Sequence, residues 1–311
     1  MKVVITARNF NIDPSAKALL VQNGFTVQDE SDRVFATQEA YFEAIDGADA
    51  VINAIEPMGA DLLQKCEKLK LIAVRGVGYD YIDSAVCRTK GIAIARTVGA
   101  VEAAVAEQAV AYILHFARRI DEQNASMQRG EWHRMMQTGA DGMTLGILGF
   151  GGIGKAIAVR ATALGMTVRY YCRHPQDACG ATYAPLDKLL QCSDYLVLAL
   201  PLTEETRGMI GKHELAQMKN GAVLINVARA AIVDTNALCD ALKSGEIGGA
   251  AVDVFETEPC ADSPLLGLPN CILTPHTAPF TKNNFIRMNR LAAENVINFF
   301  GGTIDAKYLV R

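Results

Sequence analysis

The chain has 311 residues, of which 50% are hydrophobic and 21% charged, and this composition indicates a globular protein with room for two domain cores. Its lysines and arginines are scattered and the formal net charge is −4, so we expect no nucleic acid and no membrane as partner, but a small molecule. Eight cysteines without a C-x-x-C pair indicate reduced thiols and no metal site.

The first third of the chain alternates strand and helix signals. The opening MKVVITARNF indicates a strand and not a signal peptide, and no apolar run reaches the length of about 20 residues that a membrane span needs. A cytoplasmic location is therefore expected. Further strand signals follow in FTVQD, DAVINA, KLIAVRG and GIAIAR, and this alternation is typical of a parallel sheet covered by helices.

A long alanine-rich segment between Gly99 and Gly130 has apolar residues three and four positions apart, which predicts one long helix. A second set of strand and helix signals then runs from TLGILGF to ILTPH, and a helical pattern after it returns the chain to the first domain. The predicted fold is α/β, with two doubly wound parallel-sheet domains and a cleft between them. A Rossmann nucleotide-binding domain covers 100–276, and a flavodoxin-like substrate domain combines 1–99 with 277–311.

Four short apolar runs in the second set end in chemically useful residues: GILGFGGIG at 146–154, INVAR at 225–229, AAVDVFETEP at 250–259 and CILTPH at 271–276. The runs are typical of strands buried on both faces. Ligands of open α/β sheets bind outside the carboxyl ends of the strands. We therefore expect Gly151, Arg229, Glu258 and His276 to converge on one cleft.

The run at 149–154 matches G-x-G-x-x-G between a predicted strand and a predicted helix, the context that a dinucleotide site requires. The first glycine permits a tight turn, the second lets the backbone approach a pyrophosphate, and the third lets helix and strand pack closely. This pattern predicts a cofactor cradle formed by Gly149, Gly151, Gly152, Ile153 and Gly154.

The next predicted strand, VRYYCRHP, ends without the carboxylate that would bind a free ribose 2′-hydroxyl. It offers Cys172, Arg173 and His174 instead. Because an arginine can make charge-assisted bonds to a 2′-phosphate, we predict that NADP(H) is preferred, with NAD(H) possible. The alternative is that Arg173 is a solvated surface charge.

His276 and Glu258 each lie beside a proline in a loop after a predicted strand. A carboxylate bonded to one ring nitrogen favours imidazolium and leaves the other nitrogen to donate a proton. Arg229 presents a planar fork that suits a carboxylate and can polarise a neighbouring carbonyl. Together these residues predict hydride transfer between a nicotinamide and a 2-oxo acid.

The motifs GVGYD-I-D, GFGGIG, NVARA-IVD, AVDVFETEP and TPHTA, in this order over nearly the whole chain, resemble the D-2-hydroxyacid dehydrogenase family. The resemblance implies that Arg229, Glu258 and His276 are the catalytic residues. It implies that Asp253 contacts the nicotinamide carboxamide. It also implies a homodimer through the nucleotide-binding domains, with the helix from Ala100 to Ile120 and the region of Trp132 at the interface.

The resemblance also implies substrate contacts. Arg229 and His276 are expected to bind substrate together with a loop whose amides grip the substrate carboxylate, formed by Arg75, Gly76, Val77 and Gly78. The remaining expected cofactor contacts are Pro201, Thr206, Val227 and Ala228. The chain departs from the family pattern at Tyr81, Val98 and Ala230, and these departures bear on substrate identity more than on chemistry.

We expect an NADPH-preferring reductase of glyoxylate, hydroxypyruvate or a related 2-oxo acid. The alternative within the reaction class is 3-phosphoglycerate dehydrogenase, because GVGYDYID and QRGEW also resemble that branch. A formate dehydrogenase is disfavoured, since it would carry Gln in place of Glu258. An alternative of another class is an NAD(P)-sensing, corepressor-like binding protein, which shares the scaffold.

Overall fold

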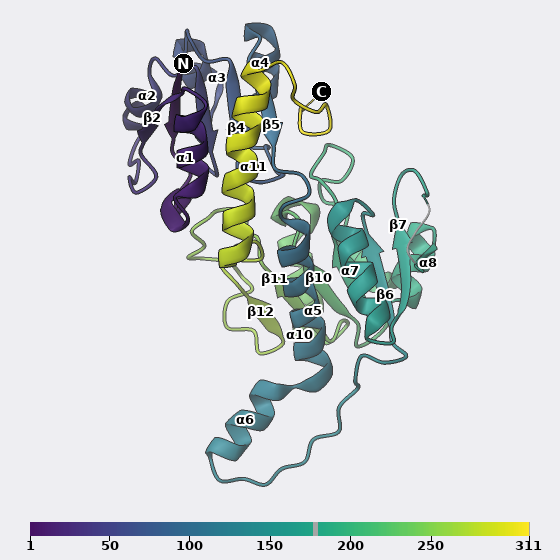
Figure 1. Cartoon of the computed structure of the whole chain (residues 1–311). Helices are drawn as coiled ribbons and strands as arrows, with labels where there is room; N and C mark the ends of the chain where they lie inside the picture. The colour runs from purple at the N-terminus through teal and green to yellow at the C-terminus, as the bar shows by residue number, and fades with distance from the viewer. Residues whose placement is uncertain (177–179, 311) are drawn as a thin grey trace. The chain divides into compact units, whose positions relative to one another are not determined.

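The computed structural model describes residues 1–176 and 180–310, so Cys179 lies outside the described residues. The chain divides into two compact units (Figure 1), unit 1 from Met1–Val101 with Phe280–Arg311, and unit 2 from Glu102–Pro279. The predicted boundaries fall after residues 99 and 276. Each unit contains one wholly parallel sheet, which confirms the predicted α/β fold class.

The sheet of unit 1 has the strand order β2-β1-β3-β4-β5, which is the flavodoxin-like order. Its strands are β1 (Lys2–Ile5), β2 (Thr26–Asp29), β3 (Ala50–Asn53), β4 (Leu71–Val74) and β5 (Ala93–Arg96). Every residue of β3 and β4 is buried, as the apolar runs predict for inner strands of a parallel sheet.

Helices cover both faces of this sheet. Those of unit 1 are the short 3-10 helix η1 (Phe10–Ile12), α1 (Ser15–Gln22), α2 (Gln38–Ile45), α3 (Ala60–Lys65), α4 (Ser84–Lys90) and α11 (Lys282–Phe300). The first and last of the α-helices, α1 and α11, share one core with β1 and β3, while α2, α3 and α4 form the core on the other face. The Thr281 side chain accepts from the Asn284 amide and so begins α11.

The sheet of unit 2 has the order β12-β11-β10-β9-β6-β7-β8. Read from β8, with β6 as the first strand in the chain, this is the Rossmann order 3-2-1-4-5-6, and β12 is added at the far edge. Its strands are β6 (Thr144–Leu148), β7 (Thr167–Tyr171), β8 (Thr182–Tyr183), β9 (Tyr195–Leu198), β10 (Val223–Asn226), β11 (Gly249–Val252) and β12 (Cys271–Leu273). Since all of them are parallel, their carboxyl ends share one edge.

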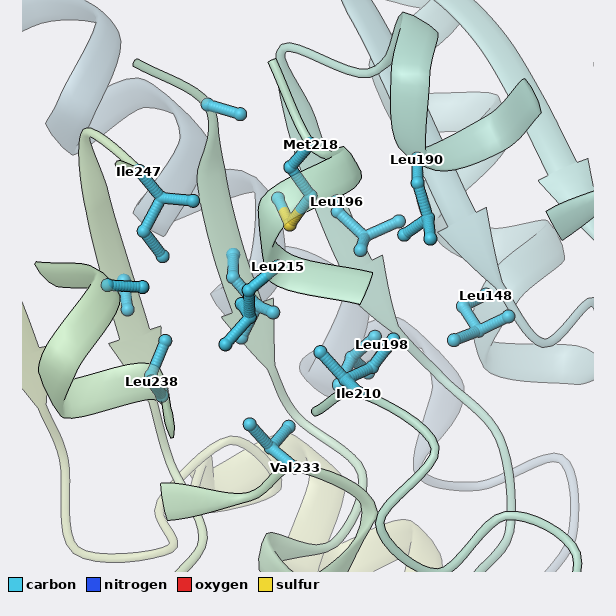
Figure 2. Packing of buried hydrophobic residues seen from close by; sticks show 14 of the residues in the cluster. Leu148, Leu190, Leu196, Leu198, Ile210, Leu215, Met218, Val233, Leu238 and Ile247 are labelled. Carbon is cyan, nitrogen blue, oxygen red and sulfur yellow. The ribbon is translucent and has the colours of Figure 1, made fainter. Parts of the chain in front are cut away.

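The helices of unit 2 are α5 (Glu102–Arg118), α6 (Ile120–Gln128), α7 (Gly152–Ala163), α8 (Leu186–Cys192), α9 (Lys212–Gln217), η2 (Ala230–Ile232) and α10 (Thr235–Ser244). Figure 2 shows one core, in which Leu196 and Leu198 of β9 pack with Leu215 of α9 and Leu238 of α10. Helices α5 and α7 lie side by side (Figure 1). No helix within the described ranges is both long and apolar enough to cross a membrane.

The predicted single helix between Gly99 and Gly130 is wrong, because the chain breaks it at Arg119. This residue has φ +46° and separates α5 from α6. The buried apolar face ends at Ala117, and only Ser126 of α6 is buried. Helix α5 therefore stops where its packing face stops, while α6 and the following segment extend away from the sheet (Figure 1).

The expectation of strands buried on both faces also fails for β12. Cys271, Ile272 and Leu273 are only half-buried, because β12 is the edge strand and pairs with β11 alone. An apolar run of three residues does not distinguish an edge strand from an inner one.

Candidate active site

The glycine run forms a tight turn between β6 and α7. Gly149 has φ +98°, and an added Cβ there would lie 2.6 Å from the Ala199 carbonyl oxygen. A Cβ on Gly154 would collide with the Gly149 carbonyl oxygen. The first and third glycines are thus required by the protein's own packing, as the motif predicts.

The middle glycine differs, because a Cβ on Gly151 would meet no protein atom within 4 Å. Gly151 lines a pocket of about 380 Å³ at the carboxyl ends of β6, β7 and β9. Gly152 and Ile153 lie beside it in the first turn of α7. Open space against a helix N-terminus is the arrangement that a dinucleotide pyrophosphate requires, so these residues fit such a cofactor.

Four further predicted cofactor residues line the same pocket, namely Arg173, His174, Pro201 and Thr206. The Thr206 hydroxyl donates to the Pro201 carbonyl oxygen at 2.8 Å, and this bond closes a turn in the loop after β9. Val227, Ala228 and Asp253 do not line it and are buried.

Sequence reasoning missed several residues that line the pocket, and the charged one among them is Glu205 in the loop after β9. The pKa of its carboxyl is lowered, mainly by the Thr203 hydroxyl and also by the charge of Arg173. The available signal was its place in PLTEET, a polar run directly after a buried strand. The pocket therefore carries a carboxylate as well as the predicted cations.

His276 and Glu258 form a hydrogen-bonded pair, with 2.8 Å between His276 Nδ1 and Glu258 Oε2. The other carboxylate oxygen of Glu258 accepts from the Phe255 amide at 3.0 Å. His276 has φ +52°, a left-handed conformation that places its ring on a sharp bend three residues after β12. With Nδ1 held by the carboxylate, Nε2 is left to exchange a proton with a ligand.

Burial raises the pKa of the Glu258 carboxyl, but the His276 ring, the Phe255 amide and the charge of Arg229 outweigh it, and the net shift is downward. A lowered pKa keeps this carboxylate ionised through neutral pH. The pairing with His276 is fully present above the ordinary pKa of a glutamate and is lost as the pH falls through the lowered value.

Arg229 lies directly beyond β10 on the same edge of the sheet. Its Nη1 donates to the Ala228 carbonyl oxygen at 2.8 Å, and the Asn226 side chain donates to the Arg229 carbonyl oxygen at 2.9 Å. Arg229 is half-buried, and its positive charge contributes to lowering the pKa of Glu258. The structure thus brings Arg229, Glu258 and His276 to one edge of unit 2.

Asp253, predicted to contact the nicotinamide, lies beneath the loop that carries His276. It is 1% exposed and accepts hydrogen bonds from Thr274 Oγ1 and from the amides of Thr277 and Ala278. The contact with nicotinamide stays a prediction. The three hydrogen bonds show that Asp253 holds the backbone of the loop at residues 274–278.

In unit 1, the loop predicted to bind a carboxylate follows β4. The Arg75 side chain is 9% exposed, donates to the Arg8 carbonyl oxygen and lies over the Phe285 ring, and burial lowers the pKa of Arg75 to about 10. Within the described part of the chain, the amides of Gly76, Val77 and Gly78 donate to no protein acceptor. These three consecutive amides are therefore available to a ligand.

The chemistry available at this edge of unit 2 is that of an NAD(P)-dependent oxidoreductase. Residues 110–278 match the family model of the D-isomer specific 2-hydroxyacid dehydrogenase NAD binding domain. The chain belongs to the D-isomer specific 2-hydroxyacid dehydrogenase family.

Similar proteins and solved structures are consistent with membership of this family. The chain is 41% identical to the glyoxylate reductase of Thermococcus litoralis over 276 residues, which cover 84% of this chain and 83% of that one. It is 38% identical to the glyoxylate reductase of Korarchaeum cryptofilum over 296 residues, covering 91% and 89%. Among solved structures, the TT0316 protein from Thermus thermophilus superposes over the full length of both chains with a TM-score of 0.88 and 32% identity.

Two glycine substitutions separate cofactor binding from folding. We expect Gly151→Ala to leave the melting temperature unchanged, because its methyl group meets no protein atom, and to weaken NADPH binding at least tenfold by obstructing the pyrophosphate. Gly154→Ala is expected to lower the melting temperature by several degrees through its collision with Gly149. Thermal unfolding and a fluorescence titration with NADPH measure both effects, and tight NADPH binding by Gly151→Ala would contradict the assignment of the pocket.

Proposed function

We propose that the enzyme reduces a small 2-oxo acid of the glyoxylate or hydroxypyruvate type to the corresponding 2-hydroxy acid, the D-isomer where the product is chiral, with NADPH as the preferred cofactor. The observation that carries this proposal is the 2.8 Å pair of His276 and Glu258 beside Arg229, on the sheet edge that also carries the glycine turn. The names of the glyoxylate reductase relatives support the substrate class.

The three side chains divide the work of a carbonyl reduction. A bound nicotinamide dinucleotide supplies the hydride. The planar fork of Arg229 binds the substrate carboxylate and polarises the 2-oxo group. His276, oriented by Glu258 through Nδ1, donates its Nε2 proton to the forming alkoxide oxygen, and in the reverse direction it removes the hydroxyl proton.

Unit 1 contributes backbone donors in this proposal. The free amides of Gly76, Val77 and Gly78 are assigned to the substrate carboxylate, since three donors on a short loop suit its two oxygens. Arg75 does not take that role through its side chain, which is already engaged with Arg8 and Phe285. The Arg75 amide does not take that role either, because it donates to the Asn53 carbonyl oxygen at 2.8 Å.

NADPH preference rests on Arg173 and His174, which line the pocket at the end of β7. Charge-assisted bonds from Arg173 to a 2′-phosphate are expected to outweigh the opposing charge of Glu205. We expect Arg173→Ala to raise the KM for NADPH about tenfold and to change the KM for NADH less than twofold. Arg207→Ala, an exposed arginine outside the pocket lining, is the matched control.

The test follows absorbance at 340 nm with NADPH and then NADH against glyoxylate, hydroxypyruvate, pyruvate, phenylpyruvate and 2-oxoisocaproate. Faster oxidation of NADPH with glyoxylate or hydroxypyruvate is the expected result. A preference for NADH would remove the role given to Arg173 and leave the catalytic assignment intact. No turnover with any acid of the panel would overturn the proposed substrate class.

We extend the proposal to a homodimer in the cytoplasm. Trp132 and Met136, 77% and 93% exposed, lie on the segment after α6 and are apolar surface of the kind that a second subunit covers. The seven described cysteines are free thiols, as a reducing compartment maintains them. The molecular mass in solution tests the dimer.

A further inference from the structure

The loop that carries His276 is fastened from beneath by one buried carboxylate. Asp253 Oδ1 accepts from Thr274 Oγ1 at 2.5 Å and from the Thr277 amide at 2.8 Å, and Oδ2 accepts from the Ala278 amide at 2.9 Å. These donors lie on both sides of His276 in the chain. Asp253 therefore determines where this bend of the backbone sits.

Tyr112 in turn forms a hydrogen bond with Thr274, the first of the three donors to Asp253. The Tyr112 hydroxyl is hydrogen-bonded to the Thr274 hydroxyl, 162 positions away in the chain. A threonine hydroxyl has one hydrogen, and that of Thr274 points to Asp253, so Tyr112 is the donor to Thr274. Burial raises the pKa of Tyr112, which keeps its proton in place.

Tyr112 belongs to α5, a helix of 17 residues whose inner face is buried through Ala109, Ile113 and Ala117. The tyrosine itself is 3% exposed. A side chain in such a setting moves little, because its neighbours occupy the surrounding volume. The hydrogen-bond chain Tyr112→Thr274→Asp253 thus ties the His276 bend to the body of α5.

We infer that Tyr112 is a positioning residue for the proton donor of the reaction, acting through Thr274 and Asp253. The inference rests on the proposed role of His276. The bend needs such support because His276 adopts φ +52°, a conformation that costs free energy for a side chain with a Cβ. Without the tyrosine hydroxyl, the ring is held less closely in the geometry that protonates substrate.

The test is Tyr112→Phe, which removes one oxygen and keeps the ring. We expect kcat to fall about five- to tenfold, while the substrate KM and the dissociation constant for NADPH change less than twofold. Thr274→Val is expected to lower kcat further, since Asp253 loses a donor as well. The double variant should be no slower than Thr274→Val alone, because both substitutions break the same chain of bonds.

Two variants serve as controls. Tyr195→Phe removes the hydroxyl of another buried tyrosine of unit 2 and should leave kcat unchanged. Tyr195 is the first residue of β9, at the end of the strand away from the site, and its hydroxyl is hydrogen-bonded to Thr138. Thr274→Ser keeps the hydroxyl and should retain most of the activity. Melting temperatures of all variants show that each is folded at the assay temperature.

A Tyr112→Phe enzyme with the kcat of Tyr195→Phe would overturn the inference, and so would a loss that falls on KM or on NADPH binding alone. His276→Ala separates this failure from failure of the proposed function. If His276→Ala is inactive and Tyr112→Phe is fully active, only the positioning role is wrong. If His276→Ala is active, the catalytic assignment itself is wrong.

Discussion

Replacing His276 by alanine is expected to lower kcat by about a hundredfold or more, the scale of general acid catalysis. The substitution removes the ring that Glu258 orients at 2.8 Å, so no side chain at this position can protonate the alkoxide. The fold should persist, because the loop is fastened through Asp253 and not through the ring. Steady-state rates with saturating NADPH and 2-oxo acid measure the effect.

The matched control is His213→Ala, which removes an exposed imidazole from α9. Its kcat should equal that of the unchanged enzyme. A His276→Ala variant that keeps kcat within threefold would show that another group delivers the proton. Circular dichroism and the NADPH dissociation constant of both variants separate a chemical loss from an unfolded protein.

The second large effect is expected for Arg229. Arg229→Lys keeps the positive charge but loses the planar fork, and we expect kcat/KM to fall about a hundredfold, or about 2.7 kcal/mol of transition-state stabilisation. Both kcat and KM should change, because the same fork binds the carboxylate and polarises the carbonyl. Arg229→Ala should cost more, since the charge beside Glu258 is lost as well.

Arg290→Ala is the control for removing an arginine, because Arg290 is exposed on α11 and pairs only with Glu294 among the described ion pairs. It should have ordinary kinetics. If Arg229→Lys altered only the affinity for NADPH, Arg229 would be a cofactor residue, and the loop amides at 76–78 would remain as the proposed partners of the substrate carboxylate. Initial rates over a grid of both substrates distinguish these outcomes.

The parts of the site that follow from strand ends could be predicted from sequence. Arg229 follows the inner strand β10, Glu258 follows the inner strand β11, and His276 follows β12, so a parallel sheet brings them to one edge whatever the details of the loops. The glycine turn was predictable for a similar reason: at Gly149 and Gly154 the backbone excludes any side chain.

Contacts between distant segments could not be predicted in this way. The bond between Tyr112 and Thr274 depends on how α5 packs on the sheet, and nothing in the alanine-rich pattern around Tyr112 marks one face as adjacent to β12. The burial of Asp253 is of the same kind, since an aspartate after a strand is typical of a ligand-binding residue until the loop above it is placed. The break at Arg119 was missed because it carries no glycine or proline signal.

The composition of unit 1 from two distant chain segments has a consequence for synthesis. Its sheet comes from the first hundred residues, but Ala292, Ala293 and Val296 of α11 complete the core against Val3 and Ile5. A ribosome therefore delivers the whole of Glu102–Pro279 before that core can close, so unit 2 can fold while unit 1 still exposes an apolar face. The segment that is translated first is the last to be finished.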